Sequence, residues 1–183
     1  METKAVRGTK VLLPSEDETP VTSWSYGTPL EGEDITNTEF RGVDLSSHRW
    51  EKVTLSRVAF YDSRMMGFTS EEATLNDVLF EGCQFDYAAL ARIRIKGSVI
   101  FVDCRFREAV FIGGDWGPVV FEGCSLAGVE LDSVKMKGTD IRGCEVPGIT
   151  GVSSLKGAQV SPGQLPELFD SFAKDLELNV SEA

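Results

Sequence analysis

FEGCQF, at residues 80–85, recurs with small changes as FVDCRF at 101–106, FEGCSL at 121–126 and IRGCEV at 141–146. All four cysteines of the 183-residue chain stand at the same place in these stretches, separated by 21, 20 and 20 residues. Self-similarity at a fixed period is typical of solenoid proteins, in which each turn of the chain packs only on its neighbours. The cysteines therefore indicate a repeating fold before they indicate any chemistry.

An apolar side chain recurs at every fifth position around these stretches. Before residue 96, with Ser70 as the one polar member, the series is Ile35, Phe40, Leu45, Trp50, Leu55, Phe60, Met65, Leu75, Phe80, Phe85, Leu90 and Ile95. After a slip of one residue within 96–98 it continues as Phe101, Phe106, Phe111, Trp116, Phe121, Leu126, Leu131, Met136, Ile141 and Val146. A set of smaller residues lies two positions before these centres. Helices repeat every 3.6 residues and strands every 2, so neither explains a period of five.

A chain that turns a corner every five residues closes a square after four corners, and residue n then lies beneath residue n+20. One column of centres reads Phe40, Phe60, Phe80, Phe101, Phe121 and Ile141. The small positions on the next side read Val43, Ser63, Cys83, Cys104, Cys124 and Cys144. Because similar residues stack on each other, we predict that the cysteines form one ladder inside a four-sided coil.

The stretches GEDI (32–35), GVDL (42–45), GVEL (128–131) and GTDI (138–141) resemble the pentapeptide-repeat family, whose consensus is A(D/N)LXX. The frequent Phe at the centre, and Cys or Val in place of Ala, make the Qnr-like and MfpA-like members the nearest functional analogues. The resemblance implies an all-β fold, a right-handed quadrilateral β-helix with a C-terminal capping or dimerisation helix. We expect an N-terminal extension or cap at 1–30, the repeat β-helix at 31–160 and the helix at 161–183.

The cysteines do not have the arrangement of a metal site or of disulfides. Zinc needs four converging ligands, whereas this spacing gives a line of parallel side chains. Parallel Cβ atoms about 4.8 Å apart also exceed the roughly 3.8 Å of a disulfide. We expect buried, reduced thiols that act as small hydrophobes, and no cofactor. His48 is the single histidine and falls at a small inward position, so we expect no catalytic residue and no enzyme.

Two sets of outward positions are candidates for binding. Just before the Phe centres lies an apolar stripe, Ala59, Leu79, Ile100 and Val120. It is either a partner surface or a surface that residues 1–30 cover with Val11, Leu12, Leu13, Trp24 and Tyr26. Just after the centres lies an acidic set that we expect to form one column, Asp62, Glu81, Asp103 and Glu122. This set is either a solvated face or a functional acidic surface, and Arg41, Arg92, Arg94, Arg105 and Arg107 interrupt other columns.

The C-terminal segment SPGQLPELFDSFAKDLELNV predicts a helix that closes the coil. Ser161 suits the N-cap, Pro162 the first turn, and Gln164 completes a capping-box spacing. One apolar face then comprises Leu165, Leu168, Phe169, Phe172 and Leu176. Because a cap alone does not need both phenylalanines, we expect a homodimer through this helix, as the family resemblance also implies.

The charge and the termini limit the possible functions. A net charge of -11 argues against direct nucleic-acid binding. The N-terminal residues do not have the pattern of a signal peptide, and no apolar run has membrane-spanning length, so we expect a cytoplasmic protein. Together with the resemblance, the charge suggests a DNA mimic that binds DNA gyrase or another topoisomerase, and the resemblance implies a role in antibiotic resistance. The alternative is a protein-interaction scaffold that uses the apolar stripe.

Overall fold

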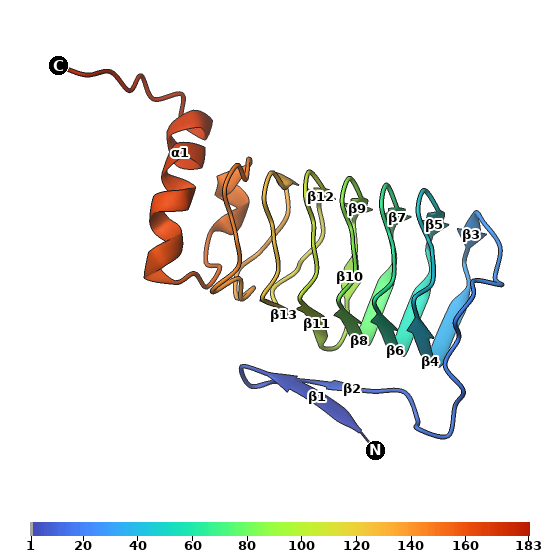
Figure 1. Cartoon of the computed structure of the whole chain (residues 1–183). Coiled ribbons are helices and arrows are strands. Elements are labelled where there is room, and N and C mark those ends of the chain that lie inside the picture. The colour runs from blue at the N-terminus through green and yellow to red at the C-terminus, as the bar shows by residue number, and fades with distance from the viewer. Residues whose placement is uncertain (1) are drawn as a thin grey trace.

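The computed structural model describes residues 2–183, and they form a four-sided coil with a hairpin along one side and a helix at one end (Figure 1). Residue 1 of the expected N-terminal extension lies outside the described residues. The strands are β1 Thr3–Val6, β2 Thr9–Leu12, β3 Leu30–Glu31, β4 Asp34–Arg41, β5 Arg49–Glu51, β6 Thr54–Tyr61, β7 Thr69–Glu71, β8 Thr74–Glu81, β9 Ala89–Ala91, β10 Arg94–Ile95, β11 Val99–Val102, β12 Val110–Ile112, β13 Val119–Glu122 and β14 Glu130–Asp132. The helical segments are the 3-10 turns η1 Val152–Leu155 and η2 Pro162–Gln164, and the α-helix α1 Leu165–Asp175.

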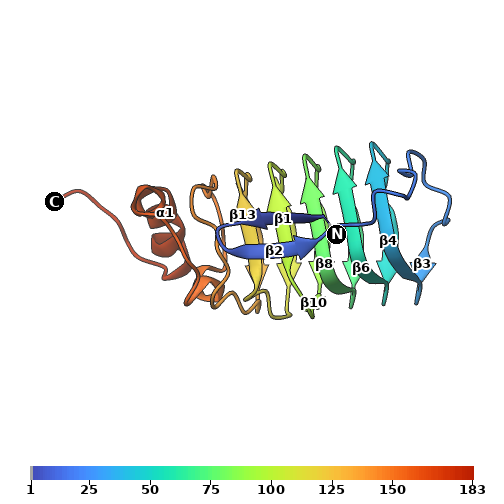
Figure 2. The same ribbon diagram turned by 90° about the horizontal axis from the view of Figure 1, so that it is seen from below.

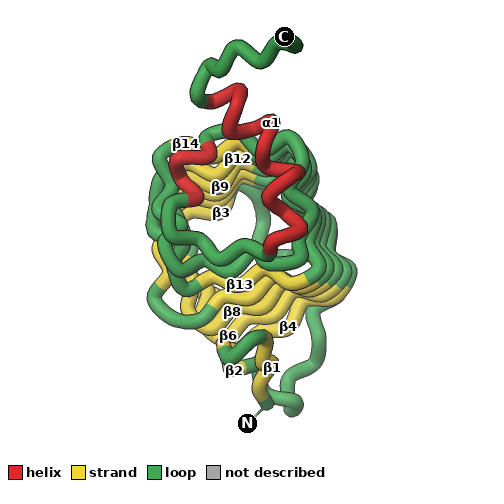
Figure 3. Tube along the Cα trace, turned by 90° about the vertical axis from the view of Figure 1, so that its left-hand side faces the viewer, coloured by secondary structure: helices red, strands yellow, loops and turns green. Residues whose placement is uncertain are grey.

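Two parallel sheets form opposite sides of the coil (Figure 3). The first, which we call the Phe face, stacks in the order β13-β11-β8-β6-β4. The second, which we call the far face, stacks in the order β14-β12-β9-β7-β5-β3. Phe40 pairs with Phe60 and Phe60 with Phe80, so residues 20 apart lie above one another. The chain is therefore the four-cornered β-helix that the five-residue period predicts.

The one-residue slip is accommodated within a single coil. Arg94 of β10 pairs with Thr74, an offset of 20 residues, whereas Val99 of β11 pairs with Val78, an offset of 21. Both partners lie on the continuous strand β8, so the extra residue lies in the loop between β10 and β11. A Cβ atom at Gly97 in that loop would collide with the side-chain amide oxygen of Asn76. The slip at 96–98 is confirmed, and glycine is the residue that fits there.

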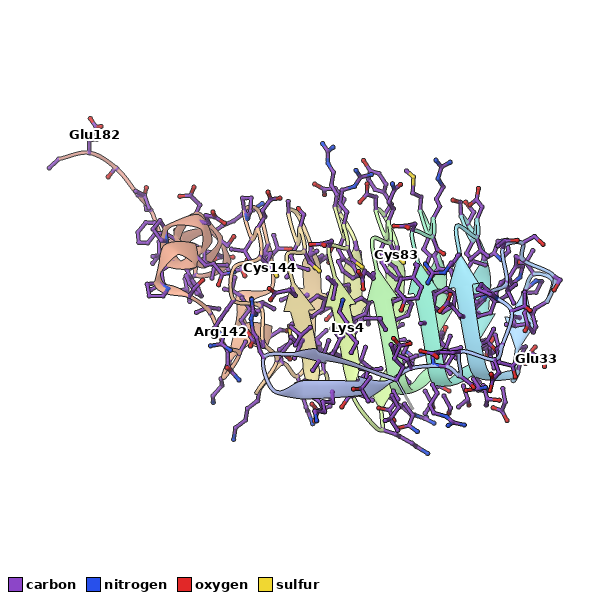
Figure 4. The ribbon with its side chains drawn as sticks, turned by 60° about the horizontal axis from the view of Figure 1, so that its bottom comes forward. Lys4, Glu33, Cys83, Arg142, Cys144 and Glu182 are labelled. Atoms are coloured by element: carbon purple, nitrogen blue, oxygen red, sulfur yellow. The ribbon has the colours of Figure 1, made fainter. Side chains whose placement is uncertain are left out.

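The interior consists of stacked side chains. On the Phe face, rings of successive coils are nearly parallel, with centroids 4.6 Å apart for Phe40 and Phe60 and 4.9 Å apart for Phe101 and Phe121. The four cysteines are unbonded to one another and buried, and each Sγ lies within hydrogen-bonding distance of a backbone carbonyl of the preceding coil. Burial raises the pKa of the Cys104 thiol well above its ordinary value. Figure 4 shows Cys83 and Cys144 within the same coil wall.

Both ends of the coil are covered by the chain itself. At the N-terminal end, Val21 pairs with the edge of β4, and the indole of Trp24 lies 5.6 Å from the ring of Phe40 and 5.3 Å from that of Trp50. At the C-terminal end, the capping box of Ser161 and Gln164 is present, and α1 lies across the last coil. Within residues 2–183, no helix combines the length and the apolarity that crossing a membrane requires.

Candidate interaction surfaces

The N-terminal strands form a hairpin that lies along the Phe face. β1 and β2 pair antiparallel through a two-residue turn, Arg7-Gly8, in which both residues have positive φ. This geometry matches the right-handed twist of the two strands and is the usual one for so short a turn. Figure 2 shows the hairpin running along the axis of the coil, across the strands that it covers.

The hairpin covers the apolar stripe. Val11 of β2 is buried in one cluster with the four stripe residues, and Val6 and Leu13 pack against its edge. The stripe side chains are Ala59, Leu79, Ile100 and Val120, and none is more than 5% exposed. The expectation that this stripe is a partner surface is therefore wrong, because residues of the same chain already cover it. Trp24 and Tyr26 do not lie over the stripe, because they close the end of the coil instead.

Charged residues hold the two ends of the hairpin to the coil. The ammonium group of Lys4 lies 3.0 Å from a carboxylate oxygen of Glu81. The Arg7 guanidinium forms an ion pair with Glu122, and one of its nitrogens lies 3.0 Å from a carboxylate oxygen of Asp140. It also donates a hydrogen bond of 2.8 Å to the backbone carbonyl of Arg142. Lys4 and Arg142 both lie on the hairpin side of the molecule in Figure 4. The hairpin is therefore fixed by an apolar seam between two ionic contacts.

The four acidic residues expected in one column belong to two. Glu81 pairs with Tyr61 and Val102, and Val102 pairs with Glu122, so the glutamates share a column. Asp62 and Asp103 stand one position further along their coils, at corners with positive φ. There they lie beside Gly82 and Gly123, where a side chain would collide with their carboxylates. The prediction of a single column is wrong, and the hairpin neutralises both glutamates.

A different acidic column was missed. Glu31, Glu51 and Glu71 are register partners on the far face, each directly after a centre of its coil. The sequence contains this signal, since the residues after Leu30, Trp50 and Ser70 are all glutamate. Glu71 forms an ion pair with Arg92, and a carboxylate oxygen of Glu51 lies 3.7 Å from the ammonium nitrogen of Lys52. The acidic surface is thus interspersed with basic residues.

Asp140 connects the hairpin turn to the acid stability of the protein. Burial acts to raise the pKa of its carboxyl, but hydrogen bonds from Arg142 and the charge of Arg7 outweigh it and lower the pKa below 3.8. A lowered folded pKa gives stability that is present above about pH 4 and is lost as the pH falls through the folded value. We expect Arg7→Gln to raise the pKa of Asp140, as followed by its carboxyl resonance in a pH titration. Arg41→Gln is the matched control, and equal Asp140 curves in wild type and Arg7→Gln would contradict this ionic contact.

The C-terminal helix separates the five predicted apolar residues into two groups. Leu168 is buried against the last coil, and Ser171 lies beside it. On the same side, Glu167 and Asp175 accept hydrogen bonds from the backbone N–H groups of Val146 and Val152. The side chains of the other four are exposed: Leu165 (52%), Phe169 (61%), Phe172 (37%) and Leu176 (67%). At about 100° per residue these four share one stripe, roughly a quarter turn from the capping side.

His48 lies at the N-terminal end of the coil. Its ring is partly buried and edge-on to the indole of Trp24, with centroids 6.0 Å apart. The position therefore gives His48 a packing contact within the aromatic cover of that end.

Part of the sequence is similar to a known repeat family, and the chain is similar to solved structures of repeat proteins. The sequence model of the family of pentapeptide repeats matches residues 104–143 as eight copies of the repeat. No curated protein matches the chain. Among solved structures, it is similar to QnrB1, a plasmid-mediated fluoroquinolone resistance protein, with 15% identity, a TM-score of 0.32 and coverage of 88% of this chain and 95% of that one.

Two cyanobacterial proteins are also similar. Rfr23 from Cyanothece, a pentapeptide repeat protein, has 12% identity and a TM-score of 0.26, with 72% of this chain and 90% of that one covered. HetL from Nostoc, described as involved in heterocyst differentiation regulation, has 10% identity and a TM-score of 0.24, with 70% and 87% covered. The model of the pentapeptide-repeat family thus matches residues 104–143, and the same stacking of residues 20 or 21 positions apart continues outside that segment.

Proposed function

We propose that the chain is a non-enzymatic binding protein that acts as a two-ended rod, with two copies joined through α1 and the sides of the coil presented to a protein partner. The observation that carries this proposal is the exposed apolar face of α1, formed by Leu165, Phe169, Phe172 and Leu176. Leu168 alone faces the core, so capping uses one of the five apolar residues. Large exposed apolar groups gathered on one helix face are typical of a surface that another molecule covers.

A second copy is the occupant that we propose for this face. A two-fold axis beside α1 brings the same stripe of both chains together, and a self-complementary apolar patch needs no other partner. Leu178 and Val180, which follow the helix, are two more large apolar residues with exposed side chains. Because α1 lies across the end of the coil, such a dimer places the two coils on opposite sides of the interface (Figure 1).

The dimer is tested by measuring mass in solution. We expect light scattering after gel filtration to give twice the chain mass of 20.0 kDa for the wild type. The double variant Phe169→Glu/Phe172→Glu should give a single chain mass, because four charges would meet in an apolar interface. Lys174→Glu, on the opposite side of α1, is the matched control and should remain dimeric. A wild-type protein that stays at one chain mass at high concentration would exclude the dimer.

For the partner we propose a type II topoisomerase such as DNA gyrase, which the rod would engage as a mimic of duplex DNA. The net charge of -11 and the carboxylates of Glu31, Glu51 and Glu71, one on each of three successive coils, support this choice. Their spacing of about 4.8 Å is sparser than the one charge per roughly 1.7 Å of duplex DNA, so several columns must act together. A supercoiling assay with and without a quinolone tests the proposal, and unchanged supercoiling and drug sensitivity at micromolar protein would refute it.

The alternative function, a scaffold that binds a partner through the apolar stripe, is not supported, since the hairpin covers that stripe.

A further inference from the structure

The last coil shows how this protein satisfies backbone groups at an open end. The centre residue Val146 has no next coil to receive its N–H, and Glu167 of α1 accepts that hydrogen bond at 3.2 Å. The N–H of Val152, at the start of η1, donates to Asp175 at 2.6 Å. An anionic oxygen thus serves as the acceptor at two terminal positions, as expected where a backbone N–H would otherwise lack a partner.

A third terminal N–H has no such acceptor. On the side of the coil between the far face and the Phe face, the centre Trp116 donates to the carbonyl of Lys135 at 2.8 Å. Met136 is the next centre on that side, and its regular acceptor would be a carbonyl of the last coil. There the chain forms η1 instead, and the N–H of Ser154 turns back to Gly151 at 3.0 Å. Within residues 2–183, the N–H of Met136 makes no hydrogen bond.

Three lysines surround this position. A groove of about 680 Å³ lies between the coil of Met136 and the last coil, and we call it the lysine groove. Its lining is Asp115, Val134, Lys135, Met136, Lys137, Ser153, Ser154, Lys156 and Gly157. Lys137 and Lys156 lie on neighbouring coils, which are joined by the hydrogen bond from Gly138 to Gly157.

The charge of this groove is not balanced from within the chain. Among the ion pairs of residues 2–183, none involves Lys135, Lys137 or Lys156. The one acidic residue of the lining, Asp115, accepts a hydrogen bond from the N–H of Gly117 at 3.0 Å. Like-charged groups on adjacent coils repel each other, so a bound anion would relieve this repulsion.

We propose that the lysine groove binds an oxyanion, a carboxylate or a phosphate group, whose oxygen accepts the hydrogen bond of the Met136 N–H. The chain uses this chemistry at Val146 and Val152, where carboxylates of α1 serve as acceptors. At Met136 the acceptor comes from a ligand, and the lysines supply the opposite charge. The hydroxyl groups of Ser153 and Ser154, in the same lining, are further donors for the remaining oxygens. This site is independent of the dimer and of the topoisomerase.

The test is an amide NMR titration of the full chain with two probes, inorganic phosphate and citrate, against sodium chloride of matched ionic strength. We expect a saturable shift of the Met136 amide that chloride does not produce. The triple variant Lys135→Gln/Lys137→Gln/Lys156→Gln should weaken binding at least about tenfold, since charged hydrogen-bond donors are lost. The triple variant Lys52→Gln/Lys96→Gln/Lys174→Gln changes the net charge equally and should bind as the wild type does.

Each outcome decides the proposal or its chemistry. A response to both probes supports a general oxyanion site, whereas a response to citrate alone or to phosphate alone supports the site and identifies the group. Shifts that do not saturate, that follow ionic strength alone, or that persist unchanged in the lysine-groove variant would overturn it. The substituted lysines are exposed, so melting curves should show that both triple variants are folded.

Discussion

Leu79→Glu should detach the hairpin β1–β2 from the Phe face while the coil stays folded. Leu79 is 0% exposed and lies between Ala59 and Ile100, directly under the hairpin. A carboxylate without a partner at this position costs several kcal/mol if it stays buried. Because lifting the hairpin exposes only a small apolar seam, the charge is hydrated by local opening and not by global unfolding.

Hydrogen exchange measures this opening directly. If the substitution disfavours the closed hairpin by about 2 kcal/mol, amides of residues 3–12 should exchange roughly thirtyfold faster, while those of β8 and β11 stay protected. Ala89→Glu is the matched control, since it adds the same charge to the uncovered far face, where Ala89 is partly exposed. Equal exchange of the hairpin in wild type and Leu79→Glu would contradict the covered stripe, and so would loss of the entire coil.

The second large effect is expected for Phe101→Ala. The Phe101 ring is 2% exposed and has its centroid 4.9 Å from both Phe80 and Phe121, with Phe106 edge-on at 5.2 Å. Removing a buried ring from so narrow an interior leaves a cavity that rigid neighbouring coils cannot fill. The free energy of unfolding should fall by about 3–5 kcal/mol.

Urea denaturation checks this value, with Tyr87→Ala as the control. Tyr87 is an aromatic residue one coil away, but it is 60% exposed, so its removal should change stability by no more than about 0.5 kcal/mol. Since each coil is stabilised by its neighbours, the loss at Phe101 should also reduce the cooperativity of unfolding. A cost below about 1 kcal/mol would mean that the stacked rings do not carry the stability of the coil.

The interior could be predicted from the sequence because it is narrow and regular. One large and one small side chain per side fill it, so the Phe column and the column from Cys83 to Cys144 are visible as repeats. The slip at Gly97 could be placed for the same reason, since one extra residue shifts every later centre. The cap helix was recognisable from Ser161 and Gln164, whose side chains satisfy groups within three residues.

The surfaces were harder to predict, because outward positions have no volume to fill. The acidic set was assigned to one column although Asp62 and Glu81 stand at different distances from their centres. Cover of the stripe by residues 1–30 was one of the two alternatives, but the hairpin itself was missed, because its local signal is short, Arg7-Gly8 between alternating residues, and its contacts lie as much as 135 residues away. The unpaired N–H of Met136 depends on where the last coil leaves the ladder, which no residue pattern indicated.

The stacking of residues 20 to 21 positions apart is tested most directly by distances between spin labels on the far face. Glu31 is the fixed site, and the second label replaces Ala91, Ile112 or Asp132, which are three, four and five coils away in the same column. At about 4.8 Å per coil, the mean separations should be near 14, 19 and 24 Å and increase by an equal step. Distances that do not increase in equal steps would contradict the four-sided coil.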